Sequence, residues 1–144
     1  MNKIKPLKIP ILVVEAHEDH QLIIAYCLWE KIPQALPIFS KTADEALLYL
    51  KQCTDDRKQF PHLVLLGSNL PQPSDFLLTE LRKQHPHLPL IVLDTFENVE
   101  QVRQAYRLGA NSVLLKPTTL PAWEALFQQI ESFWFGIAAW PSLE

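Results

Sequence analysis

Imidazole and carboxylate side chains gather near the ends of apolar runs in this sequence: Glu15, His17, Asp19, His20 and Asp94. Such groups together form a ligand set that suits zinc. Their spacing is not specific to a metal, however, and no cysteine lies beside them. We therefore expect solvated side chains that cap the helix after Glu15, with no bound metal and no cofactor.

The segment PHLVLLGSNLP, residues 61–71, organises the rest of the chain. Leu63–Leu66 is a continuous apolar run near prolines, which is typical of a central parallel strand buried on both faces. The loop at its carboxyl end is the place where such sheets bind ligands. Ser68 in that loop has no placed base and no oxyanion-hole motif, so we expect an inert serine rather than a nucleophile.

Strand-like and helix-like stretches alternate along the chain. Strands are expected at Ile11–Val14, Ile38–Phe39, Leu63–Leu66, Leu90–Leu93 and Ser112–Leu115. Helices are expected at Asp19–Lys31, from a Thr42 and Glu45 capping box to Cys53, from an N-cap at Ser74 to before Pro86, from Thr95 or Phe96 to a C′ glycine at Gly109, and from Thr118 or Thr119 onward. This alternation predicts an α/β fold with a parallel, doubly wound sheet.

Two helices carry apolar residues at spacings of three and four, which predicts an amphipathic helix in each case. The first helix has Leu22, Ile23, Tyr26, Cys27 and Ile32 in this pattern. The fourth has Val99, Val102, Ala105 and Tyr106 or Leu108. The residues named in the fourth helix are expected to lie on one face of it.

Length and composition limit the classes of function. The 144 residues suit one domain, and a net charge of −3 without a long basic run gives no support for nucleic-acid binding. No apolar run approaches the length of a signal-peptide core or a membrane span. Cys27 and Cys53 form no C-x-x-C pattern, so we expect reduced thiols and a cytoplasmic protein.

Four segments together resemble the receiver domains of bacterial two-component response regulators: ILVVE (11–15), LVLLGSNLP (63–71), LIVLDT (90–95) and GANSVLLKP (109–117). The resemblance implies a three-layer flavodoxin-like fold with five βα units and strand order 2-1-3-4-5. The SNLPQP loop and the ending ESFWFGIAAWP are similar to stand-alone regulators that partner cyanobacterial phytochrome kinases. A sensor histidine kinase or another two-component protein is the partner that this resemblance implies.

Matched to the family, the phosphorylation site of this chain is incomplete. Receivers hold Mg²⁺ with two carboxylates after the first strand and one after the third, which accepts the phosphoryl group. Glu15 keeps the first acid, Ala16 replaces the second, and Gly67 stands at the phosphoacceptor position. Asn69 could offer only a carbonyl, so the resemblance implies a poor magnesium site.

The positions that respond to phosphorylation also differ from the family pattern. Asp94, followed by Thr95, stands where a hydroxyl would bond the phosphoryl group, and Val113 stands where an aromatic ring would turn inward. Lys116 matches the phosphate-binding lysine, and we expect it to form salt bridges with Glu15 and Asp94. These differences together indicate a degenerate receiver, or pseudo-receiver.

The end of the chain is rich in aromatic residues. We divide the single domain into a core at 8–132 and an extension at 133–144, and we expect a homodimer built on the fourth helix, the fifth strand, the fifth helix and the extension. The alternative is an extension that folds back on its own domain. The expected interface residues are Trp123, Phe127, Phe133, Trp134, Phe135 and Trp140.

Three functions remain open from the sequence. The leading hypothesis is a non-enzymatic, stand-alone regulator that acts by protein contact without aspartate phosphorylation. A conventional regulator phosphorylated at a displaced residue is the second. A module that binds a ligand or metal in the altered pocket is the third, whereas a flavodoxin-like enzyme is disfavoured because the loop EAHED lacks the glycine and hydroxyl groups that cradle a phosphate.

Overall fold

The structure is a computed structural model that describes residues 8–67, 70–71 and 74–137. Strands and helices alternate along this part of the chain. The strands are β1 (Ile9–Val14), β2 (Ala35–Ser40), β3 (Leu63–Leu66), β4 (Leu90–Asp94) and β5 (Ser112–Leu115). The helices are α1 (Glu18–Lys31), α2 (Ala43–Gln52), α3 (Ser74–Gln84), α4 (Val99–Arg107) and α5 (Leu120–Ile130), and the π-helical segment η1 (Glu131–Ile137) follows α5.

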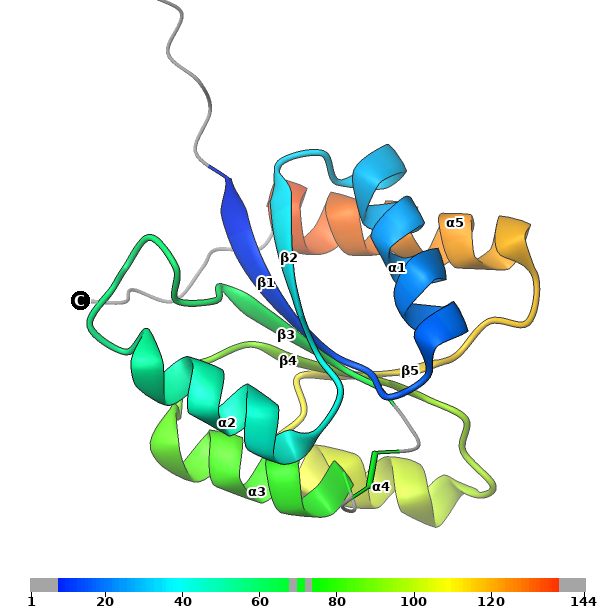
Figure 1. The fold of residues 1–144 in the computed structure, drawn as a ribbon. Helices are drawn as coiled ribbons and strands as arrows, with labels where there is room; N and C mark the ends of the chain where they lie inside the picture. Colours follow the sequence, from blue (N-terminus) through cyan, green and yellow to red (C-terminus); the bar gives the residue numbers. More distant parts are fainter. Residues whose placement is uncertain (1–7, 68–69, 72–73, 138–144) are drawn as a thin grey trace, which may run out of the picture.

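The strands form one parallel sheet in the order β2-β1-β3-β4-β5. Helices α1 and α5 cover one face of the sheet, and α2, α3 and α4 cover the other (Figure 1). This arrangement confirms the predicted doubly wound α/β fold and its strand order. None of the helices in the described residues has the length and apolar character that a bilayer crossing requires.

The core consists of two apolar layers, one on each face of the sheet. Alternate residues of a strand point to opposite faces, so Leu12 and Val64 pack toward α2, α3 and α4. Ile11 and Leu65 pack toward α1 and α5. Strand β3 is buried along its whole length, as the continuous apolar run predicts.

Local capping groups move some boundaries from their predicted places. Asn98, and not Thr95 or Phe96, caps α4, because its side chain accepts a hydrogen bond from the Gln101 N–H at 3.0 Å. As a result Val99 is the first residue of the helix, and it is 63% exposed. Tyr106 is also half exposed, whereas Ala105 is buried.

The other helix starts agree more closely with the predictions. Thr42 caps α2 through the Glu45 N–H at 3.1 Å, but the Glu45 carboxylate accepts from the Lys41 N–H and so reaches one residue further back than a capping box. Thr119 caps α5 as one of the two predicted residues. Ser74 is the first residue of α3 rather than its predicted N-cap.

Arg82 in α3 ties together the segments at the amino edge of the sheet. Its guanidinium donates to the carbonyls of Leu88 at 3.0 Å and Gly109 at 2.5 Å and to the Asn111 side chain at 3.1 Å. Gly109 has φ of 111°, which confirms the predicted C′ glycine, and a Cβ there would also lie 2.7 Å from Arg82 Nε. Asn111 in turn accepts from the Leu90 N–H at 2.8 Å.

We predict that Arg82→Ala lowers the free energy of unfolding by roughly 1–3 kcal/mol, because partly buried carbonyls of two loops lose their donor. Chemical denaturation followed by circular dichroism measures this. The control is Arg103→Ala, an exposed arginine of α4. Equal stability of the two variants would contradict the role assigned to Arg82.

Candidate functional site

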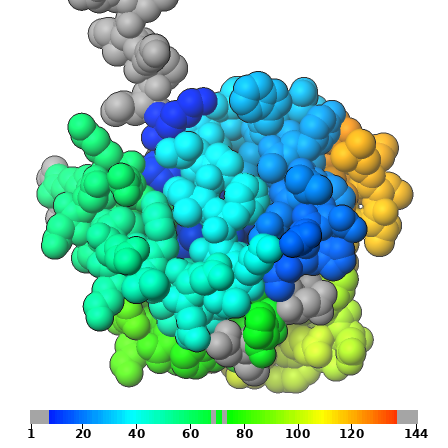
Figure 2. All heavy atoms as spheres, in the orientation of Figure 1, coloured from blue at the N-terminus to red at the C-terminus, as the bar shows by residue number. Residues whose placement is uncertain are grey.

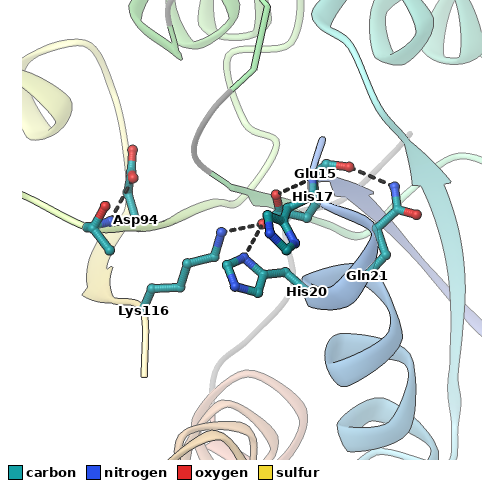
Figure 3. A network of polar contacts seen from close by, with 7 residues as sticks. Glu15, His17, His20, Gln21, Asp94 and Lys116 are labelled. Atoms are coloured by element: carbon teal, nitrogen blue, oxygen red, sulfur yellow. Dashed lines mark hydrogen bonds and ion pairs between the residues drawn. The ribbon is translucent and has the colours of Figure 1, made fainter. Parts of the chain in front are cut away.

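Glu15 lies directly after β1 and turns its carboxylate into the protein. The residue is fully buried. Its Oε1 pairs with Lys116 Nζ at 2.5 Å, and its Oε2 accepts the His17 N–H at 3.0 Å (Figure 3). Both oxygens of the buried carboxylate therefore have donors, as burial of a charge requires.

Lys116 reaches Glu15 across the strands that lie between them in the sheet. It follows β5, whereas Glu15 follows β1, and β3 and β4 lie between these strands. The Lys116 side chain is 3% exposed. The predicted salt bridge between Lys116 and Glu15 is thus confirmed, and it crosses the carboxyl ends of the central strands.

Gly67 lies at the end of β3, next to the Glu15 carboxylate. The Gly67 N–H donates to the Val14 carbonyl at 2.7 Å, which fixes its backbone against β1. A Cβ at position 67 would lie 2.5 Å from Glu15 Oε1 and 3.0 Å from its carboxyl carbon. The Glu15 carboxylate therefore occupies the space that any side chain at position 67 would need.

Two histidines at the start of α1 complete the surroundings of Glu15. The His20 Nδ1 lies 3.9 Å from Glu15 Oε1, and its ring stacks on that of His17 with centroids 4.2 Å apart. Burial lowers the pKa of His20, and repulsion by Lys116 lowers it further, so the imidazole is held neutral at neutral pH. The sequence shows that both histidines follow Glu15 closely. We predicted that they cap the helix, and we did not predict their contact with Glu15.

Asp94 lies at the end of β4, beside this site. Its Oδ1 accepts the Thr95 N–H at 2.6 Å, and its carbonyl accepts the Lys116 N–H at 2.9 Å. Asp94 also lines a cavity of about 460 Å³ between α3 and α4, together with Asp75 and Glu100. Glu100 pairs with Arg107 at 2.7 Å, and the other two carboxylates in this cavity would oppose the approach of a phosphate.

The described residues do not fit the Mg²⁺ that receivers bind. Glu15 already accepts from an ammonium group and a backbone amide, and Ala16 and Gly67 have no side-chain oxygen. Among these residues, no cluster of three or more histidine, cysteine or acidic side chains could hold a metal ion. Asn69, the remaining predicted pocket residue, lies outside the described residues.

The predicted interface residues divide into two groups. The side chains of Trp123 and Phe127 belong to the core between α5 and the sheet, being 2% and 0% exposed, so their assignment to an interface was wrong. The extension continues α5 as a π-helix, in which Trp134 and Phe135 pack partly against the same core and Phe133 is 51% exposed. Trp140 lies outside the described residues.

Comparison with known proteins finds response regulators. The chain is 30% identical over 141 residues to the response regulator Rcp1 of Synechocystis sp., with 95% of each sequence covered. The crystal structure of the phosphorylated cyanobacterial phytochrome response regulator RcpA matches with a TM-score of 0.84 and 26% identity, over 94% of this chain and 99% of that one. The Mn(2+)-bound form of Rcp1 matches with a TM-score of 0.80 and 27% identity, over 92% and 99%. No protein-family profile matches the chain.

We predict that Lys116→Met lowers the free energy of unfolding by about 3–5 kcal/mol at neutral pH, since it leaves the buried Glu15 carboxylate without its cation. The loss should shrink as the pH is lowered, because a buried carboxylate without a cation takes up a proton.

The matched control is the double variant Glu15→Gln with Lys116→Met, which removes both charges and should cost less than Lys116→Met alone. Urea unfolding at several pH values measures both variants. A single variant as stable as the double one at neutral pH would contradict the importance of the pair.

Proposed function

The chain belongs to the response regulators of two-component signalling, and from this premise we propose that it is a degenerate receiver that acts by protein contact without accepting a phosphoryl group. A sensor histidine kinase or another two-component protein is the partner class that follows from this family. The proposal assigns the altered pocket a structural role.

The position of the Glu15 carboxylate carries this proposal. It lies against Gly67, where the family has its acceptor, and it is bound to Lys116, which matches the family's phosphate-binding lysine. A phosphoryl group arriving there would find no oxygen nucleophile at position 67. It would also find the lysine already neutralised by a charge of the chain itself.

We further propose that the chain forms a homodimer through α4, β5 and α5. This side carries exposed apolar residues from different elements, and Phe133 extends them along η1. An apolar surface of this kind is typical of protein interfaces. The exposed residues are Val99, Tyr106, Leu115, Leu120 and Phe133.

We predict that acetyl phosphate with Mg²⁺ adds no mass to the protein and leaves its tryptophan fluorescence unchanged. Intact-protein mass spectrometry measures the first and a fluorescence titration the second. Phosphate found on Glu15, Ser68 or any neighbouring residue would overturn the proposal and support phosphorylation at a displaced residue.

Restoring the acceptor supplies the matched control. Gly67→Asp alone should incorporate little phosphate, because its Cβ meets Glu15 Oε1 at 2.5 Å and Ala16 still offers no metal ligand. Adding Ala16→Asp and Asp94→Thr should increase incorporation by restoring the metal ligand and the hydroxyl. Efficient phosphorylation of Gly67→Asp alone would show that Glu15 does not block the site.

We predict that replacing Leu115 and Phe133 with serine releases a monomer with unchanged helix and strand content. Both side chains are more than half exposed, so the fold does not depend on them. Sedimentation velocity measures the oligomeric state. Leu48→Ser, at an exposed position of α2, is the control, and a double variant that sediments like the parent would place the dimer contact elsewhere.

A further inference from the structure

Strand β2 is an edge of the sheet and contains a proline. The strand order leaves one side of β2 without a neighbouring strand. Two of its apolar side chains, Leu36 and Phe39, are 44% and 36% exposed. Figure 2 shows the cyan atoms of β2 at the surface, in the middle of the view. An exposed apolar edge strand of this kind is a template for pairing with another chain.

The pairing register shows which backbone groups of β2 point away from the sheet. Ile9 lies opposite Ala35, and the Ile9 N–H donates to the Gln34 carbonyl at 2.8 Å. At the other end of the strand, the Glu15 N–H donates to the Ser40 carbonyl at 2.9 Å. The even-numbered residues of β2 therefore bond to β1, because successive residues of a strand alternate in the side to which their backbone groups point. The odd-numbered residues direct their N–H and C=O groups outward.

Most of these outward positions offer no donor to a further strand. The Ala35 N–H donates to the carbonyl of the residue three before it at 2.9 Å, and Pro37 has no N–H. Just after β2, the Lys41 N–H donates to the Glu45 carboxylate of α2 at 2.9 Å. Within the described residues, the Phe39 N–H is the one donor of this row that has no acceptor.

The opposite edge of the sheet is β5, and it is closed in another way. The Tyr106 hydroxyl of α4 accepts the Val113 N–H of β5 at 3.1 Å. This is also the side on which we propose the homodimer. Two contacts between copies, one at each edge of the same sheet, would join copies into an open chain. An edge at β2 that cannot pair prevents such growth.

We propose that Pro37 and the Glu45 carboxylate close the β2 edge, so that neither a second copy nor an extended segment of another protein adds a strand there. A strand that joins a sheet is held by main-chain donors and acceptors along the edge. The outward side of β2 presents carbonyls with a single donor among them. Proline is tolerated in a strand at such a place, where an N–H would face solvent. The inference goes beyond the proposed function, since it requires neither the pocket nor the homodimer.

Pro37→Val tests this inference, because it adds the missing N–H and a side chain that favours strands. We expect β2 to pair with β2 of a second copy. The weight-average mass from sedimentation equilibrium should be at least about twice that of the parent at the same concentration. In amide exchange followed by nuclear magnetic resonance, the Phe39 N–H should exchange about tenfold or more slowly than in the parent.

Further variants separate the contributions. Pro37→Thr adds the same N–H without an apolar side chain and should also associate, which keeps the test informative if Pro37→Val fails to fold. Glu45→Ala frees the Lys41 N–H but leaves the proline, so it should keep the mass of the parent. Combined with Pro37→Val, it should associate more strongly than Pro37→Val alone. Pro86→Val, at an exposed proline after α3, is the matched control and should sediment like the parent.

Folded Pro37→Val and Pro37→Thr variants with the mass of the parent would overturn the inference. Association in which the Phe39 N–H exchanges as fast as in the parent would overturn it too, because another surface would then form the contact. Loss of helix and strand content in both variants would show that Pro37 serves the fold and not the edge. Association of Glu45→Ala alone, or equal association of Pro86→Val, would contradict the part assigned to Pro37. Equal association with and without Glu45→Ala would contradict the part assigned to the carboxylate.

Discussion

The ion pair between Glu15 and Lys116 determines the structure of the whole carboxyl edge of the sheet. Two charges can be buried there because each has a partner and the carboxylate also accepts the His17 N–H. The pair links the ends of β1 and β5 across the strands between them. It also fixes the entry into α1, since the amide that binds Glu15 belongs to the N-cap residue of that helix.

Space at this edge admits either the Glu15 carboxylate or a side chain at position 67, but not both without movement. The glycine at the acceptor position and the inward turn of Glu15 are therefore two aspects of one arrangement. The solved relatives include a phosphorylated form and a Mn(2+)-bound form. This chain keeps their fold, with its own carboxylate placed against its lysine.

The sequence allows prediction of features that depend on periodicity and topology. Strand β3 matches its predicted bounds because both of its faces are buried, and the Glu15 and Lys116 pair was predictable because parallel strands end at one edge. The inward turn of Glu15 depends on rotamers and close contacts that no spacing encodes. The sequence does not distinguish aromatic residues of α5 that pack in the core from those that would form an interface. Trp123 and Phe127 were therefore assigned wrongly. The π-helix also changes the phase of the residues after Ile130.

A filled pocket changes how a receiver can be regulated. A ligand shifts a conformational equilibrium only by binding one state more tightly than the other. Under the proposed function, no phosphoryl group binds beside Lys116, so the pocket cannot shift α4, β5 or α5 between two states. The surfaces of these three elements are then always available for binding. The extent of binding would follow the concentrations of this protein and its partners, by mass action rather than by chemical modification of the pocket.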